Sequence, residues 1–181
     1  HKENTLPTWC GGVFFLRHHV ILVLLFFPDI GVFSSMDVLE VYVSLPNDHL
    51  VPERAHPGDA GLDLYSNSRR QLIEPLERVK IDTGVSVNIP YGYVGEVCSR
   101  SGFALNKGLV VLNSPGIIDH GYVGEVSVVL ANLSNEAVYV DYMDRIAQLL
   151  IKKVELPELK VQYTPFKDTE RGDGGFGSTG V

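Results

Sequence analysis

From Val38 onwards, short runs of β-branched and aromatic residues alternate with polar residues, and turn residues separate the runs. Alternation with a period of two is typical of strands that bury one face, and many short strands predict an all-β sandwich or barrel. Prolines and glycines such as Pro57-Gly58 and Pro115-Gly116 mark the breaks. The strands that we predict are Val38–Leu45, Ala60–Tyr65, Gln71–Ile73, Arg78–Asp82, Val85–Ile89, Tyr93–Cys98, Leu109–Leu112, Gly124–Leu133, Ala137–Val140 and Arg145–Val154.

Helices contribute little to this pattern. Only Ser99–Lys107 has room for a turn or two of helix, which is too short to cover a sheet. The absence of long amphipathic helices between strands argues against a doubly wound α/β fold. We therefore predict an all-β, jelly-roll-like double sheet, and the length of 181 residues favours a single domain with one core.

The two ends of the chain differ from this central part. Residues 1–35 contain the apolar run from Val20 to Phe27, which is too short to span a bilayer, and we expect no stable membrane association. A basic start and small residues resemble a signal peptide. Because Met36 opens the strand pattern, we favour residues 1–35 as an upstream or artificial extension, with the β domain at 36–165. Residues 166–181 are rich in glycine, and we expect a mobile arm.

Charge and cysteine content narrow the function classes. The formal net charge is −7, with 15 basic and 22 acidic residues, which argues against non-specific binding of nucleic acid. Cys10 and Cys98 form neither a disulfide framework nor a zinc-site spacing. This cysteine usage fits a reducing compartment, and we expect a cytoplasmic protein.

The segment Gly116–Glu125 offers a candidate general base. Asp119 follows two isoleucines, and three glycines and Tyr122 accompany it between apolar runs. We expect a tight turn between two strands that holds the carboxylate rigidly and partly desolvated, as a general base requires. An ordinary exposed turn aspartate is the alternative interpretation.

Further polar residues occur at predicted strand ends. Arg100-Ser101-Gly102 opens the short helical segment and could bind an anion, although it also suits an ordinary turn. Asp63 lies between two leucines and needs a cation or a metal-bound water as partner. Arg145 could pair with a carboxylate or contact a substrate directly.

The tail from Arg171 to Gly180 combines glycines, hydroxyl groups and one aromatic ring. Glycine N–H groups with Ser178 and Thr179 can wrap phosphate oxygens, Arg171 can hold a phosphate, and Phe176 can lie on a base. A linker-like tail is equally compatible with this composition. Arg171-Gly172-Asp173 is also a tripeptide of some adhesion ligands, which would require a secreted chain.

Taken in order, these segments resemble the five motifs of the trimeric dUTPase family (dUTP diphosphatases). The matching segments are Ala60–Leu64, Arg100–Gly102, Gly116–Tyr122, Arg145–Leu149 and Arg171–Gly180. The resemblance implies a jelly-roll subunit in a homotrimer with shared active sites. It also implies hydrolysis of dUTP to dUMP and pyrophosphate with the help of Mg²⁺, which limits uracil in DNA and supplies dUMP for thymidylate synthesis.

The resemblance also implies roles for single residues. Asp119 would deprotonate the attacking water, and Asp63 would hold Mg²⁺ through water. Asn113 and the backbone of Ile117 and Ile118 would read uracil, while Tyr122 would exclude a ribose 2′-hydroxyl. The remaining substrate-binding residues would be Arg100, Ser101, Gly102 and Gln148 at the phosphates, and Arg171, Phe176, Gly177, Ser178 and Thr179 in the closing tail.

Two departures and two rival functions accompany this resemblance. Val123 and Ser127 stand where many relatives carry basic residues, so nucleotide binding would be weaker or would use Lys107 or a neighbouring subunit. The related dCTP deaminases use a glutamate where Val129 stands, which argues against deamination. A nucleotide-binding protein without turnover is the other alternative, and the intact Asp119 argues against it.

Overall fold

The computed structural model describes residues 40–167 and 169–174. Within them the chain forms ten strands, one α-helix and one short 3₁₀ turn. The elements are β1 (Tyr42–Ser44), η1 (Asp48–Leu50), β2 (Leu62–Tyr65), β3 (Gln71–Ile73), β4 (Arg78–Asn88), β5 (Tyr93–Cys98), α1 (Ser101–Lys107), β6 (Leu109–Val111), β7 (Gly116–Ile118), β8 (Glu125–Asn132), β9 (Val138–Val140) and β10 (Arg145–Lys153).

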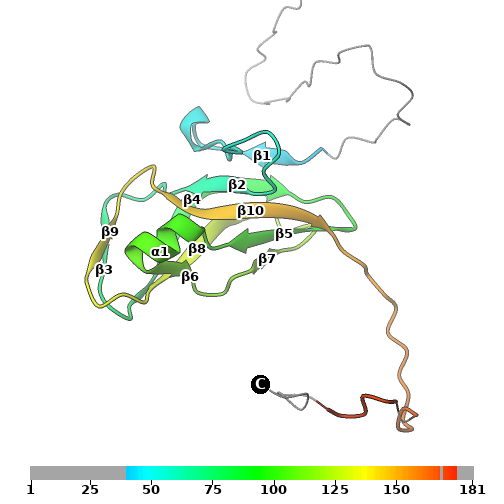
Figure 1. Ribbon diagram of the computed structural model, residues 1–181. Helices are drawn as coiled ribbons and strands as arrows, with labels where there is room; N and C mark the ends of the chain where they lie inside the picture. The colour runs from blue at the N-terminus through cyan, green and yellow to red at the C-terminus, as the bar shows by residue number, and fades with distance from the viewer. Residues whose placement is uncertain (1–39, 168, 175–181) are drawn as a thin grey trace, which may run out of the picture.

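The strands form two four-stranded antiparallel sheets and one two-stranded antiparallel sheet. One sheet has the order β1-β4-β8-β6, the other has the order β2-β10-β5-β7, and β3 pairs with β9. The β3–β9 pair lies at one end of the domain, beside α1 (Figure 1). The predicted all-β double sheet with one short helix is therefore confirmed.

A single apolar core lies between the two larger sheets. Strand β4 alternates buried and exposed positions, and its inward residues Ile81, Val85 and Val87 pack in one cluster with Leu64 and Leu149 of the opposite sheet. Removing this apolar surface from water is the main stabilising contribution to such a sandwich. Side chains at the outward positions of the same strands do not belong to this core and are available to line functional sites.

Strand β4 corrects one prediction. We predicted two strands, Arg78–Asp82 and Val85–Ile89, but the chain forms one continuous strand with a shift of register against β8 between Asp82 and Ser86. Gly84 lies at this irregularity with φ +71°, and a Cβ there would come within 2.8 Å of the Leu50 side chain. Glycine therefore bends the strand without ending it, as in a β-bulge.

The segment before Asp119 corrects a second prediction. We predicted a tight turn between Leu109–Leu112 and Gly124–Leu133, but Gly116–Ile118 forms β7, which pairs with β5 of the other sheet. Strands β6 and β8 do lie side by side. The connection between them crosses from one sheet to the other, because the β-branched pair Ile117-Ile118 extends the neighbouring sheet.

After β10 the chain leaves the sheets. Residues 154–167 and 169–174 contain no helix or strand (Figure 1). In this segment Leu159, Tyr163 and Phe166 are almost fully exposed. Residues 1–35 and most of the glycine-rich tail lie outside the described residues. None of the helices in the described part is both long and apolar enough to cross a membrane.

Candidate active site

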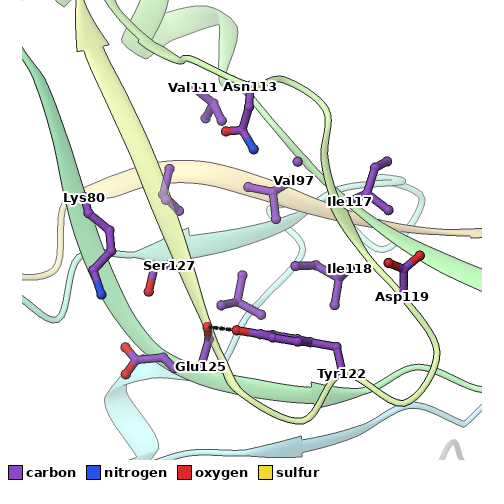
Figure 2. A pocket seen from close by; sticks show the side chains of 13 residues that line it. Lys80, Val97, Val111, Asn113, Ile117, Ile118, Asp119, Tyr122, Glu125 and Ser127 are labelled. Carbon is purple, nitrogen blue, oxygen red and sulfur yellow. Dashed lines mark hydrogen bonds between the residues drawn. The ribbon is translucent and has the colours of Figure 1, made fainter.

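A cavity of about 470 Å³ opens between β7 and β8, and we call it the Asp119 pocket. It gathers five predicted site residues: Asn113, Ile117, Ile118, Asp119 and Tyr122. Figure 2 shows Asn113 at one end and Tyr122 at the other, with Ile118 between them. These five residues are close together in the sequence. The connection that carries β7 from one sheet to the other is therefore enough to bring them together in the pocket.

Asp119 is the first residue after β7 and begins a turn. The Tyr122 backbone N–H donates to the Asp119 carbonyl at 3.2 Å, and Gly121 has φ +85°, which suits glycine. The Tyr122 hydroxyl donates to the Glu125 carbonyl at 2.9 Å. Within residues 40–167 and 169–174, no side-chain hydrogen bond or ion pair reaches the Asp119 carboxylate. The backbone of the turn therefore sets its position.

The expected partial desolvation of Asp119 is absent from the single chain, where this residue is exposed. The reason lies in the neighbouring side chains. Ile117 is 54% exposed and Tyr122 is 45% exposed, so the pocket mouth is open on this side. A carboxylate at the mouth of an apolar pocket is accessible to both a ligand and a water molecule.

Asn113 and Gly116 frame the inner end of the pocket. A Cβ on Gly116 would lie 3.2 Å from the Asn113 amide nitrogen, so glycine leaves the amide room beside the backbone of β7. Residues Ile117 and Ile118 pair with Glu96 and Gly95 of β5. An amide side chain next to a strand edge can donate and accept hydrogen bonds in one plane, as recognition of a base edge requires.

The sequence analysis did not predict Lys80 and Glu125 as pocket residues. Lys80 is the basic residue among the pocket's lining residues and lies across the pocket from Asp119 (Figure 2). Its Nζ lies 2.9 Å from Asp82 Oδ1, which also accepts from the Ser127 hydroxyl at 3.0 Å. The Lys80 hydrogen bond lowers the pKa of Asp82 and correspondingly raises the pKa of Lys80. The pairing of β4 with β8 brings this lysine to the pocket, so no local sequence pattern indicates that Lys80 lines it.

A second cavity of about 330 Å³ lies at the other end of the β2–β10–β5 sheet, and we call it the Arg100 pocket. It gathers the predicted residues Asp63, Arg100, Ser101, Gly102 and Gln148. The Gln148 amide donates to the Ser99 carbonyl at 2.9 Å. A Cβ on the pocket residue Gly61 would collide with Gln148 Oε1, so a larger residue at this position would displace the Gln148 side chain.

Asp63 joins two arginines in this pocket. Its Oδ1 accepts from Arg100 Nε at 2.8 Å, and its Oδ2 lies 3.3 Å from Arg145 Nη1. The Asp63 side chain is only 13% exposed. The carboxylate pairing that we considered for Arg145 is therefore confirmed. The same contacts hold the Arg100 guanidinium at the pocket, beside the start of α1.

The two pockets have no lining residue in common. Each therefore collects one part of the predicted site, and one chain does not bring the parts together. Arg171 belongs to neither lining, and its Nε donates to the Gly174 carbonyl at 3.2 Å. The predicted Phe176, Gly177, Ser178 and Thr179 lie outside the described residues.

Metal ligands are sparse around these pockets. Among the described residues, no three His, Cys, Asp or Glu side chains gather as a metal site. Asp63 is the predicted metal contact, and both of its oxygens already accept hydrogen bonds from arginine. Oxygen atoms are the ligands that Mg²⁺ prefers. Because both Asp63 oxygens already accept hydrogen bonds, their remaining lone pairs suit a contact with Mg²⁺ through a water molecule better than direct coordination.

Comparison with known proteins gives consistent matches. The family model described as dUTPase matches residues 47–180. The deoxyuridine 5'-triphosphate nucleotidohydrolase of Mycolicibacterium gilvum (strain PYR-GCK) is 50% identical over 153 residues, which cover 81% of this chain and 96% of the relative.

Solved structures of two phage dUTPases match as well. The Staphylococcus bacteriophage 80alpha dUTPase with dUpNHpp has a TM-score of 0.71 and 34% identity, covering 80% of this chain and all of that chain (100%). A mutant dUTPase from phage phi11 of S. aureus, described with a structural Mg(II) ion, has a TM-score of 0.64 and 30% identity and covers 72% and 100%. With the family model spanning most of the chain, and with the order of motifs described above, the chain belongs to the dUTPase family.

Proposed function

We propose that this protein hydrolyses dUTP to dUMP and pyrophosphate, with Asp119 as the general base. The observation that carries the proposal is the Asp119 pocket, which unites an amide, a strand edge, an aromatic ring and a carboxylate. Family membership and the phage dUTPase solved with dUpNHpp support it. The acidic net charge of −7 agrees with a substrate that is bound by a few placed groups rather than by a basic surface.

Uracil enters the pocket beside β7 in this proposal. Asn113 and the backbone of Ile117 and Ile118 hydrogen-bond the base edge, and the backbone leaves no room for a thymine methyl group. Tyr122 packs against the deoxyribose where a ribose would carry its 2′-hydroxyl. That hydroxyl would be buried without a partner, which disfavours UTP.

Asp119 then accepts a proton from the water that attacks the α-phosphorus. The new bond forms between the water oxygen and phosphorus, and the bond from the α-phosphorus to the bridging oxygen of pyrophosphate breaks. A carboxylate that is free of hydrogen bonds to the described residues has lone pairs available for this water.

The phosphate contacts come from the Arg100 pocket of a neighbouring subunit. Arg100, Ser101, Gly102 and Gln148 line that pocket, and Asn113, Ile117 and Ile118, which contact uracil in this proposal, do not. A homotrimer in which each Asp119 pocket faces a neighbour's Arg100 pocket completes three sites. Arg171, Phe176, Gly177, Ser178 and Thr179 of the arm 166–181 close over the nucleotide, while residues 36–165 form the domain and residues 1–35 remain outside it.

Mg²⁺ fits this site as a cofactor that the triphosphate carries. When bound, it neutralises charge on the phosphate oxygens. Asp63 would hold it through water, and Arg100, tied to Asp63, would contact the same phosphates. In the cell, cytoplasmic hydrolysis of dUTP would limit uracil in DNA and supply dUMP for thymidylate synthesis.

Deamination is the rival activity, and β8 argues against it. The place of the deaminase glutamate is Val129, which pairs with Lys80 in the sheet and has no ionisable group. Release of ammonia from dCTP would therefore contradict this proposal.

The test is pyrophosphate release from dUTP, dTTP, dCTP and UTP with Mg²⁺, using the full chain. We expect turnover of dUTP to exceed that of the others by about 100-fold or more. Asp119→Asn should lower turnover by about 10²–10⁴-fold and leave dUTP affinity unchanged. Asp141→Asn, which removes an exposed carboxylate that lines neither pocket, is the matched control. No pyrophosphate from dUTP, or an unchanged rate in Asp119→Asn, would refute the proposed function.

A further inference from the structure

The turn that carries Asp119 is tied to a second part of the chain through His120. The His120 Nδ1 lies 2.7 Å from the Ile89 carbonyl oxygen. A carbonyl only accepts, so Nδ1 carries the proton. The imidazole ring also forms a T-shaped contact with the Tyr91 ring, with ring centroids 5.7 Å apart and an interplanar angle of 88°. Ile89 and Tyr91 belong to the connection between β4 and β5.

The other hydrogen bonds of this turn join residues that are close in the sequence. Tyr122 N–H donates to Asp119, and the Tyr122 hydroxyl donates to Glu125, three residues along the chain. Among side chains of the described turn 119–122, the His120 ring is the one with a hydrogen bond to a distant segment. A Cβ on Gly121 would have no neighbouring atom within 4 Å, so no packed side chain or backbone lies on that side of the turn.

Ile89, whose carbonyl accepts this hydrogen bond, is anchored in the hydrophobic core. Its side chain is fully buried in the core, at 0% exposure. Its Cδ1 and the Cβ of Ile118 both border Gly95, at 3.3 Å and 3.1 Å from the position of a Cβ there. The hydrogen bond therefore connects His120, the second residue after β7, to the same packed region that Ile118 of β7 contacts.

We propose that His120 is a positioning residue, which holds the Asp119 carboxylate over its pocket through the hydrogen bond to Ile89. This inference rests on the proposed hydrolysis. The Asp119 carboxylate makes no side-chain hydrogen bond to the described residues, so its place depends on the backbone of the turn. A misplacement of about 1 Å can reduce a rate by about 10²-fold.

Two substitutions by amide side chains distinguish the effect of the hydrogen bond from the effect of side-chain size. The amide nitrogen in His120→Asn lies as many bonds from Cα as Nδ1 and can donate to Ile89. The amide nitrogen in His120→Gln reaches the position of Nε2 instead and serves as the matched control. His120→Ala removes both the donor and the contact with Tyr91.

The first measurement is the single-turnover rate of pyrophosphate release from dUTP at saturating enzyme, together with KM from steady-state kinetics. We expect His120→Ala and His120→Gln to be slower by about tenfold or more, with KM within about twofold of the wild type. We expect His120→Asn to recover most of the rate. Urea unfolding shows that each variant is folded.

The second measurement is independent of catalysis. Amide hydrogen exchange at Tyr122, whose N–H donates to Asp119, should accelerate in His120→Ala and His120→Gln but not in His120→Asn. A rate of His120→Ala within about twofold of the wild type overturns the inference. So does a His120→Asn variant as slow as His120→Ala, or an effect on KM alone. Inactive wild-type protein overturns the proposed function instead, and this outcome is seen before any variant is compared.

Discussion

The exchange of Asp63 for asparagine tests the ion-pair cluster of the Arg100 pocket. Asp63 accepts hydrogen bonds from Arg100 and Arg145 at 2.8 and 3.3 Å, and its side chain is 13% exposed. The arginine side chains are more exposed, at 25% and 51%. Asp63→Asn keeps the shape, removes the negative charge and leaves two guanidinium groups facing a neutral amide.

The magnitude follows from this intermediate burial. Exposed ion pairs contribute about 0.2–1 kcal/mol, whereas breaking a buried pair costs about 3–5 kcal/mol. Because Asp63 is nearly buried and its partners are partly exposed, we expect Asp63→Asn to lower the free energy of unfolding by about 2 kcal/mol. High salt should reduce this loss only slightly, because nearly buried pairs are weakly screened.

Urea unfolding at a fixed protein concentration measures the change, provided that the slope with urea stays constant. Asp141→Asn is the matched control, since Asp141 lies 3.4 Å from Arg70 and these side chains are 55% and 63% exposed. We expect the control to lose less than about 1 kcal/mol. If Asp63→Asn loses no more stability than Asp141→Asn, the cluster does not stabilise the pocket and the reasoning from burial is wrong.

Substitutions at three further positions test other parts of the structure. Tyr122→Ala should lower the preference for dUTP over UTP by about tenfold or more, measured as a ratio of kcat/KM, and Tyr122→Phe should keep that preference. Gly61→Ala should destabilise the fold by about 1 kcal/mol in urea unfolding, because the new Cβ displaces Gln148 and breaks its 2.9 Å hydrogen bond. A fully stable Gly61→Ala would contradict the predicted collision. The lowered pKa of Asp82, caused by its hydrogen bond with lysine, stabilises the fold above the unfolded pKa, and this contribution is lost as the pH falls through the folded pKa. The stability difference between wild type and Asp82→Asn should therefore shrink below about pH 4, and a constant difference would refute that assignment.

Local patterns predicted most strands, because alternation of apolar residues reports burial of one face directly. The strand Gln71–Ile73 has the predicted bounds, and the helix lies within the predicted segment. Gly84 misled the prediction, since a glycine that bends a strand and a glycine that ends one look alike in sequence. The strand Gly116–Ile118 was missed because its partner lies in the other sheet, and non-local pairing leaves no local mark.

The site residues show the same difference between what local patterns predict and what depends on non-local pairing. The motif resemblance named five lining residues of each pocket, and the residue types alone would not have separated turn residues from site residues. Lys80 and the contact of His120 with Ile89 depend on which strands become neighbours, so only the three-dimensional structure revealed them. The division of the predicted residues between two pockets is likewise a property of the folded chain.

The lack of shared lining residues between the two pockets has a genetic consequence. A chain with Asp119→Asn retains its arginine side, and a chain with Arg100→Ala retains its aspartate side. In the proposed homotrimer, mixed assemblies of these two variants would place an intact face of one beside an intact face of the other. Co-expression should therefore restore a fraction of the activity that neither variant shows alone, as complementation between two defective alleles.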